Sequence, residues 1–342
     1  GLAWTVPFGH FYNEDMKPSP SSDPPLLDIR GLKTWYPIKK GVFARTVGHV
    51  RAVDGVDLTL SRGETLGIVG ESGCGKSTLA RTVLRLERPR EGTIHVNGAD
   101  VLRVRGAALH AYRRTVQVVF QDPHASLNPR HTVLDILTEA MLAHGLVTRE
   151  NRSAAAVRLL ADVGLSDDIL DRYPHAFSGG QRQRLCIARA LALEPQLLIC
   201  DEAVSALDLS VRAQVLNLLE ELQEKRGLAY LFITHDIGVV QHIADRIAVM
   251  YLGGIVETGP AQAVLSEPAH PYTQLLLRAV PKIGVPLPEE TDGPSEPVRR
   301  RPRIGCPFAP RCPLADDTCR AAAPVLKPSS SDPDHLVACF KA

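Results

Sequence analysis

The sequence has little net charge and lacks a long apolar run. Its 39 Lys and Arg residues are nearly balanced by 38 Asp and Glu residues, which leaves a formal net charge of +1. A charge so close to zero gives no sign of a nucleic-acid-binding surface or of a large acidic partner. No apolar segment approaches the roughly 18 residues that suggest a membrane span. If the protein works at a membrane, we expect other chains to cross the bilayer.

We also expect no signal peptide in residues 1–15, since they show no basic stretch followed by an apolar core. The segment KPSPSSDPP (17–25) is rich in Pro and Ser, which predicts a disordered lead-in. Met16 lies directly before it and is a candidate natural start, which makes residues 1–15 an upstream extension; residues 1–25 together form the predicted N-terminal extension and lead-in. The whole chain of 342 residues exceeds what one hydrophobic core usually serves, and we expect two or three structural units.

Seven cysteines are unevenly distributed. Three are scattered, but four fall within the last 37 residues, at Cys306, Cys312, Cys319 and Cys339. A clustered set of four in a cytosolic chain indicates a metal site rather than disulfides. The spacing matches neither the close pairs of zinc ribbons nor the bacterial ferredoxin pattern. Four thiolates still suit a tetrahedral cage for zinc or a 4Fe–4S cluster, and four free thiols are the alternative.

Strand-like and helix-like segments alternate along the chain, which predicts a mostly parallel sheet covered by helices. Helical periodicity dominates between residues 121 and 195, as expected for a helical insertion. From Glu257 onward Pro is frequent and the periodicity weakens, which indicates a separate C-terminal region. The predicted strands are 26–36, 50–60, 63–70, 92–100 (a hairpin with Asn97-Gly98 as its turn), 116–120, 196–200, 228–234 and 246–253, and the predicted helices are 76–86, 153–165, 181–193 and 211–225.

A glycine-rich loop follows one buried strand. In the residues GESGCGKST (70–78), four residues separate Gly70 from the run Gly75, Lys76 and Ser77, which is the phosphate-binding loop (P-loop) pattern. Glycines let backbone N–H groups turn onto phosphate oxygens, and the following helix N-terminus adds positive potential. Lys76 would reach the β- and γ-phosphates of ATP, and Ser77 would bind Mg²⁺. A chance glycine-rich turn is the alternative, but the strand before it and the helix after it favour a nucleotide site.

Polar residues end three other predicted strands. Asp201 and Glu202 follow the apolar run LLIC, Gln121 follows VQVVF, and His235 follows LFIT. Because the carboxyl ends of parallel strands meet at one sheet edge, we expect these side chains near the P-loop. Asp201 would join the Mg²⁺ shell, Glu202 would face the attacking water, Gln121 would sense Mg²⁺ or the water, and His235 would contact the γ-phosphate. The alternatives are helix-capping acids and a structural histidine.

A second glycine-containing segment, FSGGQRQR (177–184), lies more than a hundred residues after the P-loop. Ser178 offers a hydroxyl, Gly179 and Gly180 expose backbone donors, and the helix that starts near Gln181 points its positive end outward. The segment therefore has the features of a phosphate site. An ordinary helix N-cap at Ser178 is the alternative interpretation.

These motifs, together with SALD (205–208), resemble those of ABC transporter ATPase subunits in order and spacing. The resemblance runs from about Leu26 to the C-terminus, and the FSGGQ segment is specific to the superfamily. It implies an α/β fold: a P-loop NTPase core of the RecA type with an antiparallel β subdomain (26–256), a helical subdomain at about 121–195, and a small Cys-rich metal-binding C-terminal region (257–342). VFQDPHASLNPR (119–130) and HPYTQLLLRAVP (270–281) resemble the ATPases of dipeptide and oligopeptide importers, whose close relatives import nickel or glutathione.

In that family the FSGGQ segment holds the γ-phosphate of ATP bound to the other chain of a head-to-tail dimer. The resemblance also implies an aromatic on adenine, for which Tyr36 is the first choice and Trp35 its rival. The family usually has proline after the catalytic acid, and here it is Ala203; we expect a modest effect on rate because both acids remain. The nucleotide-contacting residues implied are Tyr36, Gly70, Ser72, Gly73, Cys74, Gly75, Lys76, Ser77, Thr78, Asp201 and Asp208, with Ser178, Gly179, Gly180 and Gln181 acting on the partner's ATP.

The resemblance further implies two transmembrane permease subunits as partners, docked at a groove beside Gln121 on the cytoplasmic face of the membrane. A second ATPase subunit, identical or paralogous, and, indirectly, an extracytoplasmic substrate-binding protein complete the importer. It favours a 4Fe–4S cluster over zinc for the four cysteines, with a structural role. Two rival classes are a soluble ABC ATPase acting on DNA or ribosomes and a regulatory subunit without turnover. The first usually has long insertions or two ATPase units in one chain, and intact Glu202 and His235 argue against the second.

Overall fold

The computed structural model describes residues 24–41, 44–279, 304–329 and 332–342. The predicted N-terminal extension lies outside this described part, except for its last two residues. Four strands form an antiparallel sheet in the order β2-β1-β4-β5: β1 (Leu27–Lys40), β2 (Arg45–Leu60), β4 (Glu91–Val96) and β5 (Ala99–Asp100). The predicted hairpin turn connects β4 and β5, with left-handed backbone at Asn97 (φ 51°) and Gly98 (φ 75°), as a tight hairpin requires.

A second sheet has eight strands in the order β11-β12-β10-β9-β3-β8-β7-β6. The run from β9 to β6 is parallel throughout, as the strand–helix alternation predicts. Its central strands β3, β7 and β8 are buried at every position, which explains their continuous apolar sequences. These five strands are β3 (Thr65–Val69), β6 (Val116–Val119), β7 (Leu197–Asp201), β8 (Ala229–Thr234) and β9 (Arg246–Tyr251).

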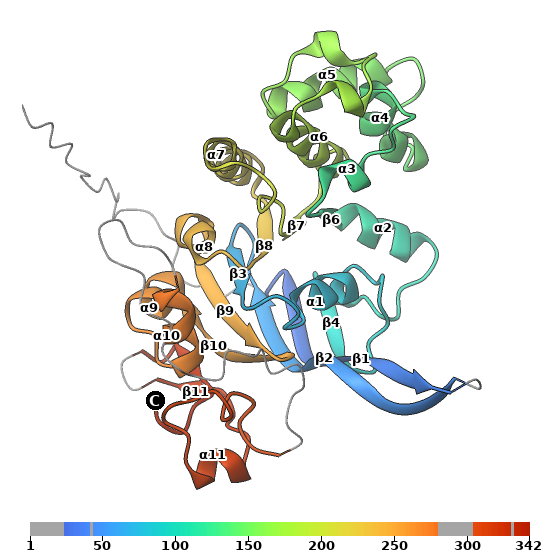
Figure 1. Cartoon of the computed structure of the whole chain (residues 1–342). Coiled ribbons are helices and arrows are strands. Elements are labelled where there is room, and N and C mark those ends of the chain that lie inside the picture. The colour runs from blue at the N-terminus through green and yellow to red at the C-terminus, as the bar shows by residue number, and fades with distance from the viewer. Residues whose placement is uncertain (1–23, 42–43, 280–303, 330–331) are drawn as a thin grey trace, which may run out of the picture.

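Helices fill the segment between β6 and β7 and stand apart from the antiparallel sheet (Figure 1). Their apolar faces pack together around fully buried leucines such as Leu137, Leu160 and Leu185, and so the insertion has a core that continues into α7. The insertion contains α3 (Pro123–Ser126), α4 (Val133–Ala143), α5 (Arg152–Asp162) and α6 (Gly179–Leu191), with 3₁₀ turns at Asp167–Ile169 and Pro174–Ala176.

Four further helices connect the strands. In α7 the predicted apolar face is buried at Val215, Leu218, Leu219 and Leu222, which packs the helix against the core of the insertion and of β7 and β8. This α7 ends at Gly227, whose left-handed backbone (φ 63°) suits a helix C-terminus. The helices are α1 (Lys76–Val83), α2 (Ala107–Thr115), α7 (Leu209–Arg226) and α8 (Ile237–Ile243).

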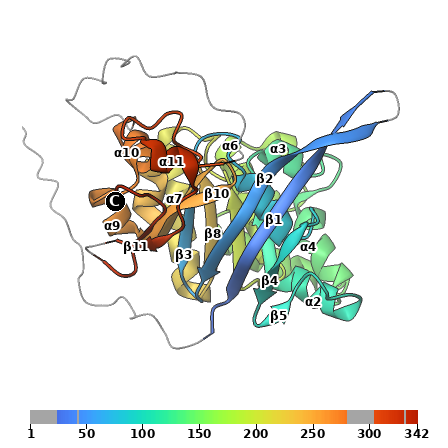
Figure 2. The ribbon, with the colours of Figure 1, turned by 90° about the horizontal axis from the view of Figure 1, so that it is seen from below.

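The C-terminal residues are joined to the main sheet. The predicted boundary at residues 256/257 falls within β10 (Gly254–Pro260), and β12 (Leu336–Val337) pairs with β10 at Glu257↔Val337. His335 Nε2 lies 2.7 Å from Glu257 Oε1, and both side chains are almost fully buried. Figure 2 shows α9 and α10 of this region at the opposite end of the molecule from the tip of the β1–β2 ribbon. Its other elements are α9 (Ala261–Ser266), α10 (Pro271–Arg278), α11 (Asp317–Ala321) and β11 (Lys327–Pro328).

Candidate nucleotide-binding site

The glycine-rich loop lies between the end of β3 and the start of α1. Gly75, directly before α1, has φ 116°, and a Cβ atom there would lie 2.0 Å from the carbonyl oxygen of Ala52. Only glycine fits this conformation and this close approach. The tight turn brings Lys76 back into the loop, where Nζ donates to the carbonyl oxygens of Gly70 (2.7 Å) and Glu71 (3.0 Å). The loop thus has the strand–turn–helix geometry of a phosphate-binding site.

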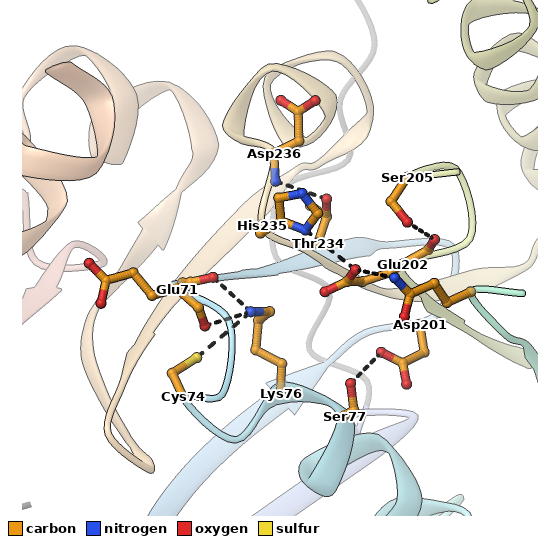
Figure 3. A network of polar contacts seen from close by, with 12 residues as sticks. Glu71, Cys74, Lys76, Ser77, Asp201, Glu202, Ser205, Thr234, His235 and Asp236 are labelled. Carbon is orange, nitrogen blue, oxygen red and sulfur yellow. Dashed lines mark hydrogen bonds and ion pairs between the residues drawn. The ribbon is translucent and has the colours of Figure 1, made fainter. Parts of the chain in front are cut away.

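Lys76 and Cys74 are both buried in this loop, and Figure 3 shows their side chains converging. Burial raises the pKa of the Cys74 thiol, so Cys74 stays protonated and acts as a small apolar residue. Its contact with nucleotide stays a prediction, one that the backbone N–H of Cys74 would make. Of the predicted loop residues, Ser72, Gly73 and Thr78 belong to the same turn and first helical residues.

Ser77 and Asp201 meet as predicted. The Ser77 hydroxyl donates to Asp201 Oδ1 at 2.9 Å, which joins the start of α1 to the end of β7 (Figure 3). Burial raises the pKa of the Asp201 carboxyl, although the Ser77 hydrogen bond opposes this shift. A hydroxyl and a carboxylate are oxygen ligands of the kind that Mg²⁺ takes, and a bound cation would favour the ionised form of Asp201. The pair therefore fits the predicted Mg²⁺ site.

Glu202 lies at the centre of a second group of predicted residues. Gln121 Nε2 donates to Glu202 Oε2 at 2.9 Å, and His235 Nδ1 lies 3.3 Å from the same oxygen. Three strand ends far apart in the sequence thus converge on one carboxylate, as Figure 3 shows for Glu202 and His235. Gln121 contacts this carboxylate rather than Asp201, and its predicted contact with Mg²⁺ or the water stays a prediction. The group can orient a water molecule and accept its proton.

The backbone at Glu202 is left-handed, with φ 51°, which is uncommon for a residue with a side chain. Three hydrogen bonds hold it: its N–H donates to the Ile233 carbonyl at 2.8 Å, and its carbonyl accepts from the Ser205 hydroxyl at 2.9 Å and from the Ser205 N–H at 3.1 Å. Ala203, which stands where the family usually has proline, is buried and packed in the core. The turn therefore keeps a defined shape through its hydrogen bonds, and the modest effect of Ala203 on rate stays a prediction.

The FSGGQ segment begins α6. Ser178 Oγ accepts from the Gln181 N–H at 3.3 Å, and Gln181 Oε1 accepts from the Ser178 N–H at 3.0 Å, which is a capping box. Ser178 is therefore the N-cap of α6, and its predicted contact with the partner's ATP stays a prediction. A Cβ at Gly180 would lie 2.5 Å from Val211 Cγ1, whereas one at Gly179 would meet no atom within 4 Å. Packing within the chain thus explains Gly180 but not Gly179.

The structure distinguishes the two candidates for the adenine contact, Trp35 and Tyr36. The guanidinium groups of Arg51 and Arg90 lie over the Trp35 ring, 4.7 and 4.6 Å from its centroid, so Trp35 already has partners for its face. Tyr36 remains the predicted adenine contact and is half-buried on β1.

Asp208 of the SALD segment caps α7 by accepting from the Val211 N–H at 3.0 Å. This bond lowers the pKa of the Asp208 carboxyl, and the predicted contact of Asp208 with nucleotide stays a prediction.

The four C-terminal cysteines line one small pocket, together with His270, Phe308 and other residues. Burial raises the pKa of the Cys306 and Cys312 thiols. Within the described ranges, no group of three or more His, Cys, Asp or Glu side chains is arranged to hold a metal ion. The structure therefore places the four predicted cysteine ligands around one pocket. Their side chains are not arranged there as a metal-binding group.

Sequence reasoning missed two residues beside the nucleotide site. Glu71 in the P-loop and Arg311 in the cysteine-bearing loop form an ion pair with two bonds of 2.9 Å. The two residues are 240 positions apart, and the only signal in the sequence was an acidic residue at a position that the P-loop pattern leaves unspecified.

Known proteins with similar sequences are ATP-binding proteins of transporters. The chain is 49% identical to the oligopeptide transport ATP-binding protein AppF of Bacillus subtilis, over 92% of this chain and 96% of that protein. It is 47% identical to the dipeptide transport ATP-binding protein DppF of Escherichia coli, over 92% and 94%. A solved dimeric ATP-binding cassette with ADP and Pi superposes with a TM-score of 0.60 at 28% identity, covering 69% of this chain and 98% of that one.

The parallel sheet with its P-loop, the acidic pair after β7 and the helical insertion define an ATPase of the ABC transporter class, whose family model matches residues 53–205. A second model, the C-terminal region of oligopeptide/dipeptide transporters, matches residues 256–319. The chain belongs to the ATP-binding proteins of the oligopeptide and dipeptide ABC transporter family. Like them it is an ATP-hydrolysing protein.

Proposed function

We propose that this chain is the ATP-hydrolysing subunit of a membrane importer for dipeptides or oligopeptides. Its relatives carry these functions in their names and match it over nearly their whole length. Among the helices of the described residues, none is long and apolar enough to span a membrane. We assign the crossing to two permease subunits, on whose cytoplasmic side this chain sits, and the delivery of cargo to an extracytoplasmic substrate-binding protein.

The residues at the site have distinct roles in this function. Lys76 and the P-loop N–H groups bind the phosphates, Ser77 and Asp201 hold Mg²⁺, and Glu202 accepts the proton of the attacking water. Mg²⁺ held there would neutralise charge that develops on the phosphates. Gln121 and His235 orient Glu202 and the water. Contacts with ATP that exist only when two subunits close would shift the population toward the closed state.

The observation that carries this proposal is the start of α6 in the FSGGQ segment, where Ser178 and Gly179 are exposed although Phe177 before them is buried. Gly179 begins a helix of thirteen residues and has open space where a Cβ would lie, so the chain's own packing does not require glycine there. Figure 1 places α6 far from α1, which follows the P-loop of the same chain. The α6 N-terminus attracts anions. We infer that Gly179 leaves room for the γ-phosphate of ATP on a second, identical or paralogous subunit.

The Gly179→Asp substitution tests this composite site. An aspartate at the first position of a helix is compatible with the fold, but its charge would face the partner's phosphates. We expect ATP binding by the isolated chain to be unchanged. ATP turnover by the assembled transporter should fall at least about tenfold, since opposing like charges costs several kcal/mol. Equilibrium ATP titration and phosphate release measure the two effects.

Gly179→Asn is the matched control, because it adds nearly the same volume without charge and should reduce turnover less. Turnover of the Gly179→Asp transporter at the wild-type rate would contradict the composite site. So would full ATP turnover by a single polypeptide.

We also propose that Cys306, Cys312, Cys319 and Cys339 hold a 4Fe–4S cluster, with zinc as the alternative. The support is that all four thiols line one pocket, and thiolates suit both iron–sulfur clusters and zinc. A bound cluster would cross-link a region that is otherwise built from short elements and loops. Nothing in the described residues indicates a partner for electron transfer. We therefore propose that the cluster stabilises this region.

Anaerobic purification tests the cluster. We expect a brown protein with broad visible absorption and about four iron atoms per chain. Cys312→Ser should lose most of the iron and lower the melting temperature, because metal binding is coupled to folding. The control is Cys186→Ala, which changes a buried cysteine in the helical insertion and should keep the iron. A colourless protein with one zinc per chain would overturn the cluster in favour of zinc.

Glutathione is a second candidate cargo. The chain is 50% identical to the glutathione import ATP-binding protein GsiA of Salmonella typhi over 82% of its length, although this covers only 43% of that longer protein. The near full-length match to dipeptide and oligopeptide relatives favours peptides. Uptake of labelled dipeptide and of labelled glutathione by the same reconstituted transporter distinguishes the two.

A further inference from the structure

The C-terminal region holds a residue of the P-loop directly. Arg311 Nη1 and Nη2 donate to Glu71 Oε2 and Oε1, each at 2.9 Å, so two parallel charge-assisted bonds join the side chains. The Arg311 side chain is 15% exposed and that of Glu71 is 32% exposed. Figure 3 shows the Glu71 carboxylate turned away from Lys76, although its carbonyl oxygen faces Lys76.

The backbone of Glu71 is also held by hydrogen bonds. Its N–H donates to the Tyr272 hydroxyl at 2.8 Å, which ties it to α10. Its carbonyl oxygen accepts from Lys76 Nζ at 3.0 Å. Two of the three polar groups of Glu71 therefore bind C-terminal elements, and the third binds the lysine that reaches the phosphates. The position of Glu71 thus affects where the Lys76 ammonium lies.

Arg311 is itself fixed by aromatic packing. Its guanidinium lies 5.9 Å from the Tyr251 ring centroid and 5.7 Å from that of Phe308. Phe308 is buried and packs against both Tyr251 (5.3 Å) and Tyr272 (5.5 Å). The Arg311 N–H donates to the Phe308 carbonyl at 2.9 Å. Arg311 directly precedes Cys312, so the cysteine-bearing loop determines where the guanidinium is placed.

A carboxylate in a phosphate-binding loop is a liability, because it repels the triphosphate. We propose that Arg311 is a positioning residue for ATP: it neutralises Glu71, turns its carboxylate away from the phosphates, and transmits the order of the cysteine-bearing loop to the P-loop. This inference rests on the ATP-binding function proposed above. It assigns the C-terminal region a role in nucleotide affinity.

ATP titration of the full-length chain tests the proposal, in a Glu202→Gln background so that ATP is not consumed. We expect Arg311→Ala to weaken ATP binding about tenfold, or about 1.4 kcal/mol, because an unpaired carboxylate then faces the phosphates. Glu71→Gln added to Arg311→Ala should recover most of the affinity, since it removes that charge. With Glu202 intact, Arg311→Ala should raise KM for ATP and leave kcat nearly unchanged.

Arg320→Ala is the matched control, because Arg320 is an exposed arginine of the same region whose partner is Asp317; it should leave ATP affinity unchanged. Cys312→Ser should weaken ATP binding only when Arg311 is present. The proposal is overturned if Arg311→Ala binds ATP as tightly as its parent. It is also overturned if the added Glu71→Gln recovers nothing. A parent chain that binds no ATP would instead refute the proposed function itself.

Discussion

Replacing Glu202 by glutamine should reduce ATP hydrolysis by the assembled transporter by about 10² to 10⁴-fold, the range that a general base contributes. Glutamine keeps the size of the side chain and can still pair with Gln121, but it cannot accept the proton of water. ATP binding should persist, since Lys76, Ser77 and Asp201 are unchanged. Phosphate release measures the loss, and retained ATP on the purified complex measures the binding.

The geometry explains why this effect should be specific. Glu202 Oε2 accepts a hydrogen bond from Gln121 Nε2 at 2.9 Å and lies 3.3 Å from His235 Nδ1. These two contacts hold the carboxylate in place at the edge of the sheet. Glu224→Gln, which changes an exposed acid on α7, is the control and should hydrolyse ATP normally. Hydrolysis by Glu202→Gln at the wild-type rate would show that another group accepts the proton.

The catalytic part of the fold was predictable because its signals are local. A buried strand followed by a fixed glycine spacing predicts the P-loop, and polar residues at strand ends predict the group around Glu202. The parallel order of β9, β3, β8, β7 and β6 follows from strand–helix alternation. These inferences depend on residues within one strand and the turn after it. Long-range pairing is needed only to bring the strand ends together.

The C-terminal region was harder to predict for the opposite reason. β12 has two residues and pairs with β10 nearly eighty positions earlier, too short a strand to show any periodicity. The Glu71–Arg311 pair joins two loops, so neither residue lies in a periodic segment. The capping role of Ser178 was visible in the sequence as an alternative, because Gln181 stands three residues later as a capping box requires.

Trp35 illustrates how tertiary contacts decide between neighbours. Trp35 and Tyr36 are adjacent on β1, and composition cannot distinguish them as adenine contacts. The structure places Arg51 and Arg90 over the Trp35 ring and a hydrogen bond of 3.2 Å from its indole N–H to Asp54. These cation–π contacts occupy Trp35, which supports Tyr36 as the residue to test.

Lys76→Met should weaken ATP binding about ten- to hundredfold, since losing a hydrogen bond to a charged group costs about 1.5–3 kcal/mol. Methionine keeps the length and apolar stem of lysine, so the buried site stays filled, but it cannot bind the phosphates. It also leaves the carbonyl oxygens of Gly70 and Glu71 without the donor they have at 2.7 and 3.0 Å. ATP titration measures the affinity, and thermal unfolding measures the effect on the loop.

A control variant and two outcomes of the Lys76→Met experiment separate the role of the Lys76 charge in ATP binding from its role in stabilising the P-loop. Lys225→Met, at an exposed position of α7, is the control and should change neither affinity nor melting temperature. If Lys76→Met binds ATP as tightly as the wild type, the ammonium does not contact the phosphates. If it unfolds at the wild-type temperature yet binds ATP weakly, the bonds to Gly70 and Glu71 contribute little to stability. The charge of Lys76 then accounts for the affinity. When ATP binds, the buried Lys76 ammonium would donate to phosphate oxygens in place of the carbonyl oxygens of Gly70 and Glu71.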